Sequence, residues 1–96
     1  MRLSPLERKA LHKALDGIEG EVYLFGSRLD DDKRGGDIDI LLKPKEKVKG
    51  FELSSQIRVR FFMEMDQDID VLVYKEEDPF SQEIMKRAQR ITLKNI

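Results

Sequence analysis

Hydrophobic residues recur along the chain in short groups that predict helices and strands in alternation. Residues 5–18 carry apolar side chains three and four positions apart, the spacing of one face of an α-helix. Ser4, Pro5 and Glu7 match a helix start, with a capping serine, a proline in the first turn and an acid at the capping-box position. Gly17 suits a left-handed helix end. The expected apolar face comprises Leu6, Ala10, Leu11, Ala14, Leu15 and Ile18.

Three short runs rich in β-branched, aromatic and other large apolar residues predict strands. They cover residues 22–25, 37–42 and 68–74. Pro44 ends the second run, because proline has no N–H to donate to a strand ladder. A further short strand is expected within the last few residues.

The segment 45–65 fits two descriptions. Apolar residues four apart are typical of a helix, whereas apolar residues alternate with polar ones in its second half as in a strand. We favour a helix over about 48–64, because the sheet needs a crossover element there. One helix face cannot bury all the large apolar residues of this segment, so Phe62 or Met63 is expected on the surface as part of an interaction patch. The alternative is that the whole stretch is core.

A last helix is predicted to begin at Asp78 and Pro79, which supply a cap and a first-turn proline. Its expected apolar face comprises Phe80, Ile84, Ala88 and Ile91. No linker or low-complexity stretch divides the 96 residues, and we expect a single domain over 1–96.

Composition excludes several classes of function. The absence of cysteine rules out thiolate catalysis and cysteine-bound zinc, and a lone histidine, His12, rules out a multi-histidine metal site. The 18 lysine and arginine residues balance 19 acids, giving a net charge of −1, which is not typical of nucleic-acid or anionic-membrane binding. No apolar run is long enough for a membrane span or a signal peptide, so a cytoplasmic protein is expected.

Two of the predicted strands begin with the same pattern of acids. Asp37 and Asp39 open one, and Asp68 and Asp70 open the other. Side chains two positions apart on a strand point to the same face, so neighbouring strands would bring these carboxylates together. Two charges about 4 Å apart repel by roughly 4 kcal/mol at an effective dielectric constant of about 20. Raised pKa values, basic partners or a divalent cation must offset this repulsion, and oxygen-only ligands suit Mg²⁺ or Mn²⁺.

Gly26 and Ser27 follow directly after a predicted strand. Such a turn presents backbone N–H groups and a hydroxyl, which suit a phosphate. Arg28, Lys33 and Arg34 are candidate partners of a polyphosphate. Each signal alone has a simpler explanation, because a Gly-Ser pair is commonly just a turn and an Asp-x-Asp pair a solvated strand end. Their order along the chain is more specific than either.

That order resembles the signature of the DNA polymerase beta-like nucleotidyltransferase superfamily. The resemblance is carried by residues 24–28 (LFGSR), 37–41 (DIDIL) and the acid-led strand at 68–74. The short length looks like that of the minimal nucleotidyltransferases. The resemblance implies an α+β fold, with a small mixed β-sheet and helices packed on one face.

The resemblance also implies roles for individual residues. Family members hold a triphosphate on a Gly-Ser turn and two Mg²⁺ ions on three carboxylates. By motif match, Gly26 and Ser27, with Arg28, would bind the nucleotide. The catalytic and metal-binding residues would be Asp37, Asp39 and Asp70. Asp70 fits better than Asp68, since it directly precedes the apolar run, and it would accept the proton of the attacking hydroxyl. The loop before Asp37 is slightly shorter than is common in the family, and its acids at 30–32 would repel a triphosphate unless they point outward.

The implied activity is Mg²⁺-dependent transfer of AMP from ATP to a hydroxyl, with Mn²⁺ as a possible substitute. Minimal nucleotidyltransferases resemble antitoxins, and some modify a tyrosine of a HEPN-type toxin partner. One alternative is a non-catalytic module of the same fold that binds a partner or forms a homo-oligomer. Another is nucleotidyl transfer to a small molecule or, less in keeping with the charge, to nucleic acid.

Overall fold

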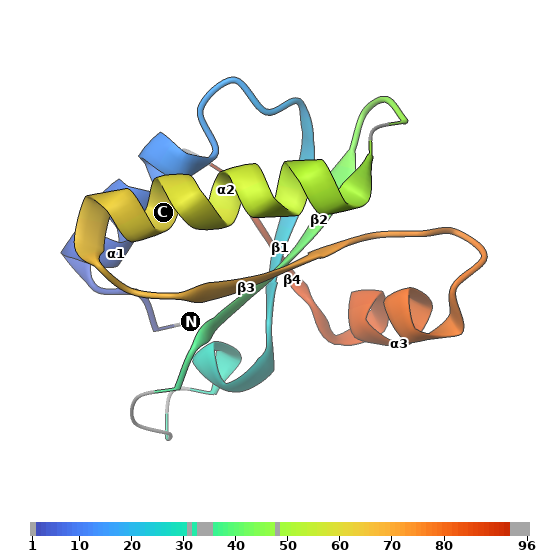
Figure 1. Ribbon diagram of the computed structural model, residues 1–96. Coiled ribbons are helices and arrows are strands. Elements are labelled where there is room, and N and C mark those ends of the chain that lie inside the picture. Colours follow the sequence, from blue (N-terminus) through green and yellow to red (C-terminus); the bar gives the residue numbers. More distant parts are fainter. Residues whose placement is uncertain (1, 31, 33–35, 48, 93–96) are drawn as a thin grey trace.

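A computed structural model describes residues 2–30, 32, 36–47 and 49–92. Its elements follow one another in the order α1 (Pro5–Ala14), β1 (Gly20–Phe25), the 3₁₀ turn η1 (Gly26–Leu29), β2 (Ile38–Pro44), α2 (Gly50–Met65), β3 (Ile69–Val73), α3 (Pro79–Arg87) and β4 (Gln89–Ile91) (Figure 1). The helix favoured over residues 48–64 is confirmed as α2. β4 lies at 89–91, where the last helix was expected to continue, and the final residues 93–96, for which a short strand was expected, lie outside the described residues. Pro44 is the last residue of β2.

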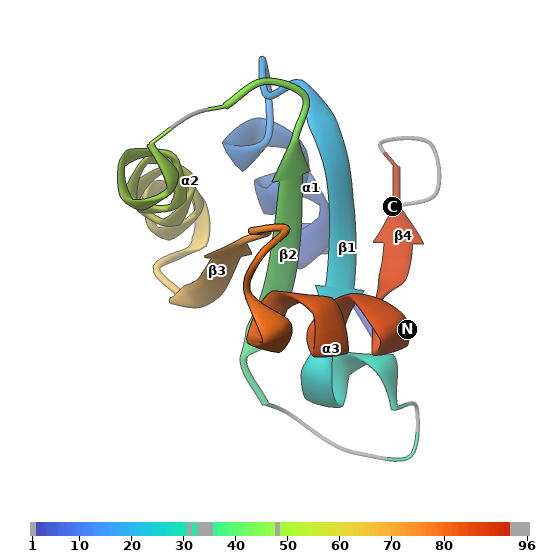
Figure 2. The ribbon, with the colours of Figure 1, turned by 90° about the vertical axis from the view of Figure 1, so that its right-hand side faces the viewer.

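The four strands form one mixed sheet in the order β3-β2-β1-β4. β1 runs antiparallel to β2 and β4, whereas β2 and β3 are parallel. Parallel neighbours need a crossover, which α2 supplies. α1 and α2 pack against the sheet and against each other, while the short α3 lies on the other side of the strands from α1 (Figure 2). The expected α+β fold with a small mixed sheet is confirmed.

The hydrophobic core lies between the sheet and the pair α1 and α2. β2 contributes alternate residues to it, namely Ile38, Ile40 and Leu42, while Ile57 and Phe61 enter from α2. Because side chains alternate along a strand, the residues between these on β2 face away from the core. The alternation therefore assigns Asp39 to the opposite face of the sheet.

Local signals set the helix ends as expected. The Ser4 hydroxyl accepts a hydrogen bond from the Glu7 amide, and the Ser4 amide donates to the Glu7 carboxylate, which completes the predicted capping box. Asp78 caps α3 by accepting from the Phe80 amide. Gly17 adopts a φ of +80°, the expected left-handed conformation that favours glycine, but α1 already ends at Ala14, so Ile18 lies beyond the helix.

Two predicted apolar faces are wrong in part. Leu6 is 69% exposed and Phe80 is 62% exposed. The inward positions next to them belong to the buried polar residues Glu7 and Ser81, each held by hydrogen bonds. Ile91 is buried in β4 and not on the helix, because α3 ends at Arg87.

The expected surface residues of α2 are confirmed. Phe61 is fully buried, whereas Phe62 and Met63 are 45% and 79% exposed. Val59, one turn earlier on α2, is exposed as well. Among the described residues, none of the helices has both the length and the apolar character that a membrane crossing requires.

Candidate active site

The strand register brings two of the predicted acidic residues together. β2 and β3 are paired so that Asp39 lies opposite Asp70 and Ile38 opposite Ile69. Directly opposed residues on paired strands project to the same side of the sheet. Asp39 is half-buried and Asp70 is exposed. Asp68 precedes the paired region, so the register joins Asp39 to Asp70 and not to Asp68.

The electrostatics of Asp39 reflect this crowding. Burial raises the pKa of Asp39, and a hydrogen bond with Asp70 and the negative charges of Asp70 and Asp37 raise it further, to about 6. The ion pairs Lys13–Glu64, Arg28–Glu7 and Lys86–Glu83 do not involve Asp39 or Asp70. At neutral pH the ionised Asp39 therefore lies against like charge, which a bound cation would relieve.

The Gly-Ser turn is in contact with this acidic pair. Gly26 has a φ of +77°, and a Cβ at this position would overlap Oδ2 of Asp39. Glycine suits this position for two reasons: other residues rarely adopt a positive φ, and every other residue has a Cβ that would overlap Asp39. The close approach of the Gly26 backbone to Asp39 joins the predicted phosphate-binding turn to the predicted metal-binding residues.

A second close approach holds the other end of the loop. Gly36 has a φ of +86°, and a Cβ there would overlap the Ser27 hydroxyl. The residue after Gly36 is Asp37, so the loop returns to the Gly-Ser turn immediately before the first acid of the Asp-x-Asp pair. Lys33, Arg34 and Asp31, the other charged residues considered for this loop, lie outside the described residues.

The structure engages Arg28 with the protein itself. Its guanidinium donates to both carboxylate oxygens of Glu7, at 2.8 and 2.7 Å, and to the carbonyl oxygens of Arg2 and Gly36, both at 2.9 Å. The side chains of Arg28 and Glu7 are only 11% and 7% exposed. Sequence reasoning missed Glu7 as the partner, because the capping box alone accounted for that acid.

Glu7 also has a strongly shifted acidity. Burial raises the pKa of Glu7, but hydrogen bonds from Arg28, the Ser4 amide and Gln67, together with the charge of Arg28, outweigh it and lower the pKa to about 2. The ion pair therefore stays charged over the whole range in which proteins are usually studied.

Within the described ranges, no three acidic or histidine side chains are grouped so that they could hold a metal ion by themselves. The adjacent carboxylates of Asp39 and Asp70 nevertheless fit Mg²⁺, which typically takes one or two protein carboxylates and completes its shell with waters and substrate phosphates. The oxygen-only donors and the repulsion that raises the pKa of Asp39 favour the same ion.

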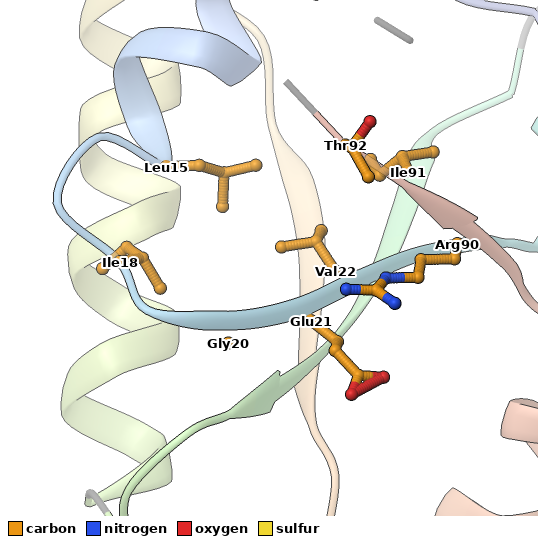
Figure 3. Close-up of a pocket in the computed structure, with 8 residues that line it drawn as sticks. All are labelled: Leu15, Ile18, Gly20, Glu21, Val22, Arg90, Ile91 and Thr92. Atoms are coloured by element: carbon orange, nitrogen blue, oxygen red, sulfur yellow. The ribbon is translucent and has the colours of Figure 1, made fainter. Parts of the chain in front are cut away.

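A cavity elsewhere in the molecule is separate from the acidic pair. It measures about 200 Å³ and lies at the start of β1, between the end of α1 and β4 (Figure 3). Leu15, Ile18 and Val22 form its apolar wall, and Glu21 and Arg90 are its charged residues. Gly26 follows the other end of β1, where Phe25 is paired with Asp39, so this cavity lies apart from the acidic pair and the Gly-Ser turn.

Comparison with known proteins agrees with this geometry. The profile of the family described as "Polymerase beta, Nucleotidyltransferase" matches residues 12–96. The chain belongs to this family. The match covers the Gly-Ser turn and all the predicted acidic residues, so the nucleotidyltransferase resemblance read from the sequence is confirmed. A search of curated proteins finds no match.

Two solved structures share the fold. One is a mutant of the toxin–antitoxin complex MntA–HpeT, with 17% identity and a TM-score of 0.58, and the alignment covers 85% of this chain and 66% of that one. The other is a tri-AMPylated Shewanella oneidensis HEPN toxin in complex with an MNT antitoxin, with 18% identity, a TM-score of 0.55 and coverages of 85% and 62%. The chain therefore spans slightly less than two thirds of the length of these two structural neighbours.

Proposed function

We propose that this nucleotidyltransferase domain, over residues 1–96, transfers AMP from ATP to a protein hydroxyl in a Mg²⁺-dependent reaction. The observation that carries the proposal is the contact of the Gly26 backbone with Asp39, which is itself paired with Asp70. A turn suited to phosphates thus touches carboxylates suited to Mg²⁺. Nucleotide transfer needs both within one site.

In this proposal Asp39 and Asp70, with Asp37, hold Mg²⁺ together with the triphosphate. When bound there, the cation would neutralise the phosphates and lower the pKa of the acceptor hydroxyl. Gly26 and Ser27 hold the triphosphate through backbone N–H groups and the Ser27 hydroxyl. Asp70 takes the proton as the acceptor oxygen bonds to the α-phosphorus. The bond between the α-phosphorus and the bridging oxygen breaks, and pyrophosphate leaves with the electron pair.

The proposed acceptor is a tyrosine of a HEPN-type toxin, to which this chain acts as antitoxin. Both structural neighbours are toxin–antitoxin complexes, and the toxin of one carries AMP groups. The exposed apolar residues Val59, Phe62 and Met63 of α2 supply a surface for such a partner.

A second candidate function is binding without catalysis, in which the chain neutralises its partner by contact. The observation that favours it is that the described acids form no three-residue metal cluster on their own. Mutually repelling carboxylates argue against it, because a binding module gains nothing from holding Asp39 against Asp70.

The test first looks for a HEPN-type reading frame beside that of this chain and uses its product as acceptor, with ATP labelled on the α-phosphate. Transfer of label that requires Mg²⁺ and is lost in Asp39→Asn and Asp70→Asn supports the catalytic proposal. Asp30→Asn is the matched control, since Asp30 is a loop acid outside the proposed metal-binding set, and its carboxylate accepts from the Asp32 amide. Complex formation without label transfer would refute catalysis and favour contact neutralisation.

A further inference from the structure

We propose that the Glu7–Arg28 ion pair positions the Gly26–Ser27 turn relative to the two aspartate-bearing strands, and that Arg28 acts through Glu7 and not by touching the nucleotide. The inference rests on the proposed function in taking the turn as the nucleotide-binding site. That the ion pair orients the turn is a separate claim about the structure of this chain.

The pair has the geometry of an orienting contact. Arg28 presents two parallel N–H groups to the two oxygens of Glu7, the arrangement that fixes both direction and distance. Two further N–H groups are donated to the carbonyl oxygens of Arg2 and Gly36. Four of the five guanidinium N–H groups are thus donated to acceptors within the chain.

The pair also joins every segment from which the site is built. Arg28 belongs to η1, directly after the Gly-Ser turn. Its bond to the Gly36 carbonyl fixes the residue before Asp37. Glu7 accepts at 3.3 Å from the Gln67 side chain, in the connection that leads into β3 and Asp70. One charged pair therefore links the phosphate-binding turn to the starts of both acid-bearing strands.

The N-terminal segment encloses the same turn from the outside. The Arg2 amide donates to the Arg28 carbonyl at 2.8 Å, and the Arg2 side chain donates to the carbonyls of Ser27 and Asp30 at 2.9 and 2.7 Å. These bonds occupy the carbonyl oxygens of Ser27 and Arg28 in η1 and of Asp30 directly after it, so the backbone of the turn is bonded to the N-terminal segment. The residues before and within α1 thereby fix the orientation of the turn.

A purely stabilising role explains the pair less well. Buried ion pairs contribute little net stability compared with apolar residues of the same size. The Glu7 and Arg28 side chains are nearly buried, and the guanidinium of Arg28 also donates to backbone carbonyls beside the Gly-Ser turn and before Asp37. Orientation is the property that an apolar replacement could not supply.

The test is a double-mutant cycle with Glu7→Gln, Arg28→Lys and the double variant, measured by calorimetric titration with Mg²⁺ and a non-hydrolysable ATP analogue. Each single variant is expected to weaken nucleotide binding about tenfold, and the double variant to bind no more weakly than the singles, because both changes break one contact. Glu83→Gln breaks an exposed ion pair on α3 and is the matched control.

Folding is measured separately by thermal unfolding, and binding is compared well below each melting temperature, so a loss of stability alone leaves the affinity unchanged. If Glu7→Gln does not fold, Glu7→Asp replaces it in the double-mutant cycle. Amide NMR spectra without nucleotide report the site directly: both single variants should shift the resonances of Gly26, Ser27 and Asp70.

The outcomes separate the possibilities. Weakened binding in Arg28→Lys with unchanged binding in Glu7→Gln would overturn the proposal and make Arg28 a direct nucleotide ligand. If the native chain binds no nucleotide, the proposed function fails. The NMR shifts then decide whether the pair positions the turn, and unchanged Gly26 and Ser27 resonances would refute that role.

Discussion

Replacing Asp39 by asparagine is expected to stabilise the protein at neutral pH in the absence of Mg²⁺. Burial, the hydrogen bond with Asp70 and the charges of Asp70 and Asp37 raise the pKa of Asp39 from 3.8 to about 6. At about 1.4 kcal/mol per pKa unit, the charged form is disfavoured by at most about 3 kcal/mol. Because the site is open to solvent, screening reduces the expected gain to about 1–2 kcal/mol. The amide of the new side chain can also donate to Asp70.

The expected difference in stability between Asp39→Asn and the native protein depends on pH. The folded state holds the Asp39 proton more tightly than the unfolded state does, so the resulting stability is complete below pH 3.8 and is lost as the pH rises through about 6. Asp39→Asn has no such loss. The native protein and the variant should therefore differ least in acid and most above pH 6.

Urea unfolding followed by circular dichroism over a series of pH values measures the difference. Mg²⁺ should reduce the difference in stability between the two proteins, because the cation stabilises the native protein, whereas the variant offers it one carboxylate fewer. Asp30→Asn is the control for the loss of a loop charge. A variant that is less stable than the native protein at neutral pH, or a difference that does not change with pH, would refute the electrostatic account of the site.

Three further predictions concern ligands, the ion pair and the core. Mg²⁺ and ATP together should raise the melting temperature by more than the two separate shifts combined. A ligand at a hundredfold excess over Kd adds about 2.7 kcal/mol to the free energy of unfolding, and calorimetry that finds no shift with both would exclude the site. Glu7→Gln should lower the free energy of unfolding in urea by about 3 kcal/mol, because Arg28 loses its partner. The stability that ionised Glu7 contributes is present above pH 4.5 and is lost as the pH falls towards 2. A native protein whose stability does not change in acid would contradict this prediction. Phe61→Ala should cost about 3–5 kcal/mol and the exposed Met63→Ala less than about 0.5 kcal/mol, and equal losses would contradict the burial of Phe61.

Local signals in the sequence were sufficient for most elements of the fold, with β4 as an exception, because the last helix was expected to continue through Ile91. The capping box at Ser4, the cap at Asp78 and the runs of β-forming residues act over a few neighbours, and each appears where it was predicted. The helix over residues 48–64 followed from topology, since parallel strands cannot be joined without a crossover.

Burial at the edges of the helices was not predictable in the same way. An apolar repeat identifies a helix, but tertiary contacts decide which residues at the edge of its apolar face point inward. Glu7 points inward because Arg28, far along the chain, bonds to it. Ser81 does so because it accepts from the Lys75 amide and donates to Asp78. Leu6 and Phe80, next to these residues, are left exposed.

The site depends on a feature that the sequence indicates only indirectly, which is the register of β2 against β3. Ile38 is paired with Ile69 and Asp39 with Asp70, so the two aspartates face each other while the two isoleucines enter the core. A shift of one residue would turn one aspartate pair towards the core and its isoleucines towards solvent. Burial of the isoleucines thus enforces the pairing of the acids, and the energy that folds the sheet also offsets the repulsion between Asp39 and Asp70. The hydrophobic core can therefore hold the carboxylates together before any cation binds.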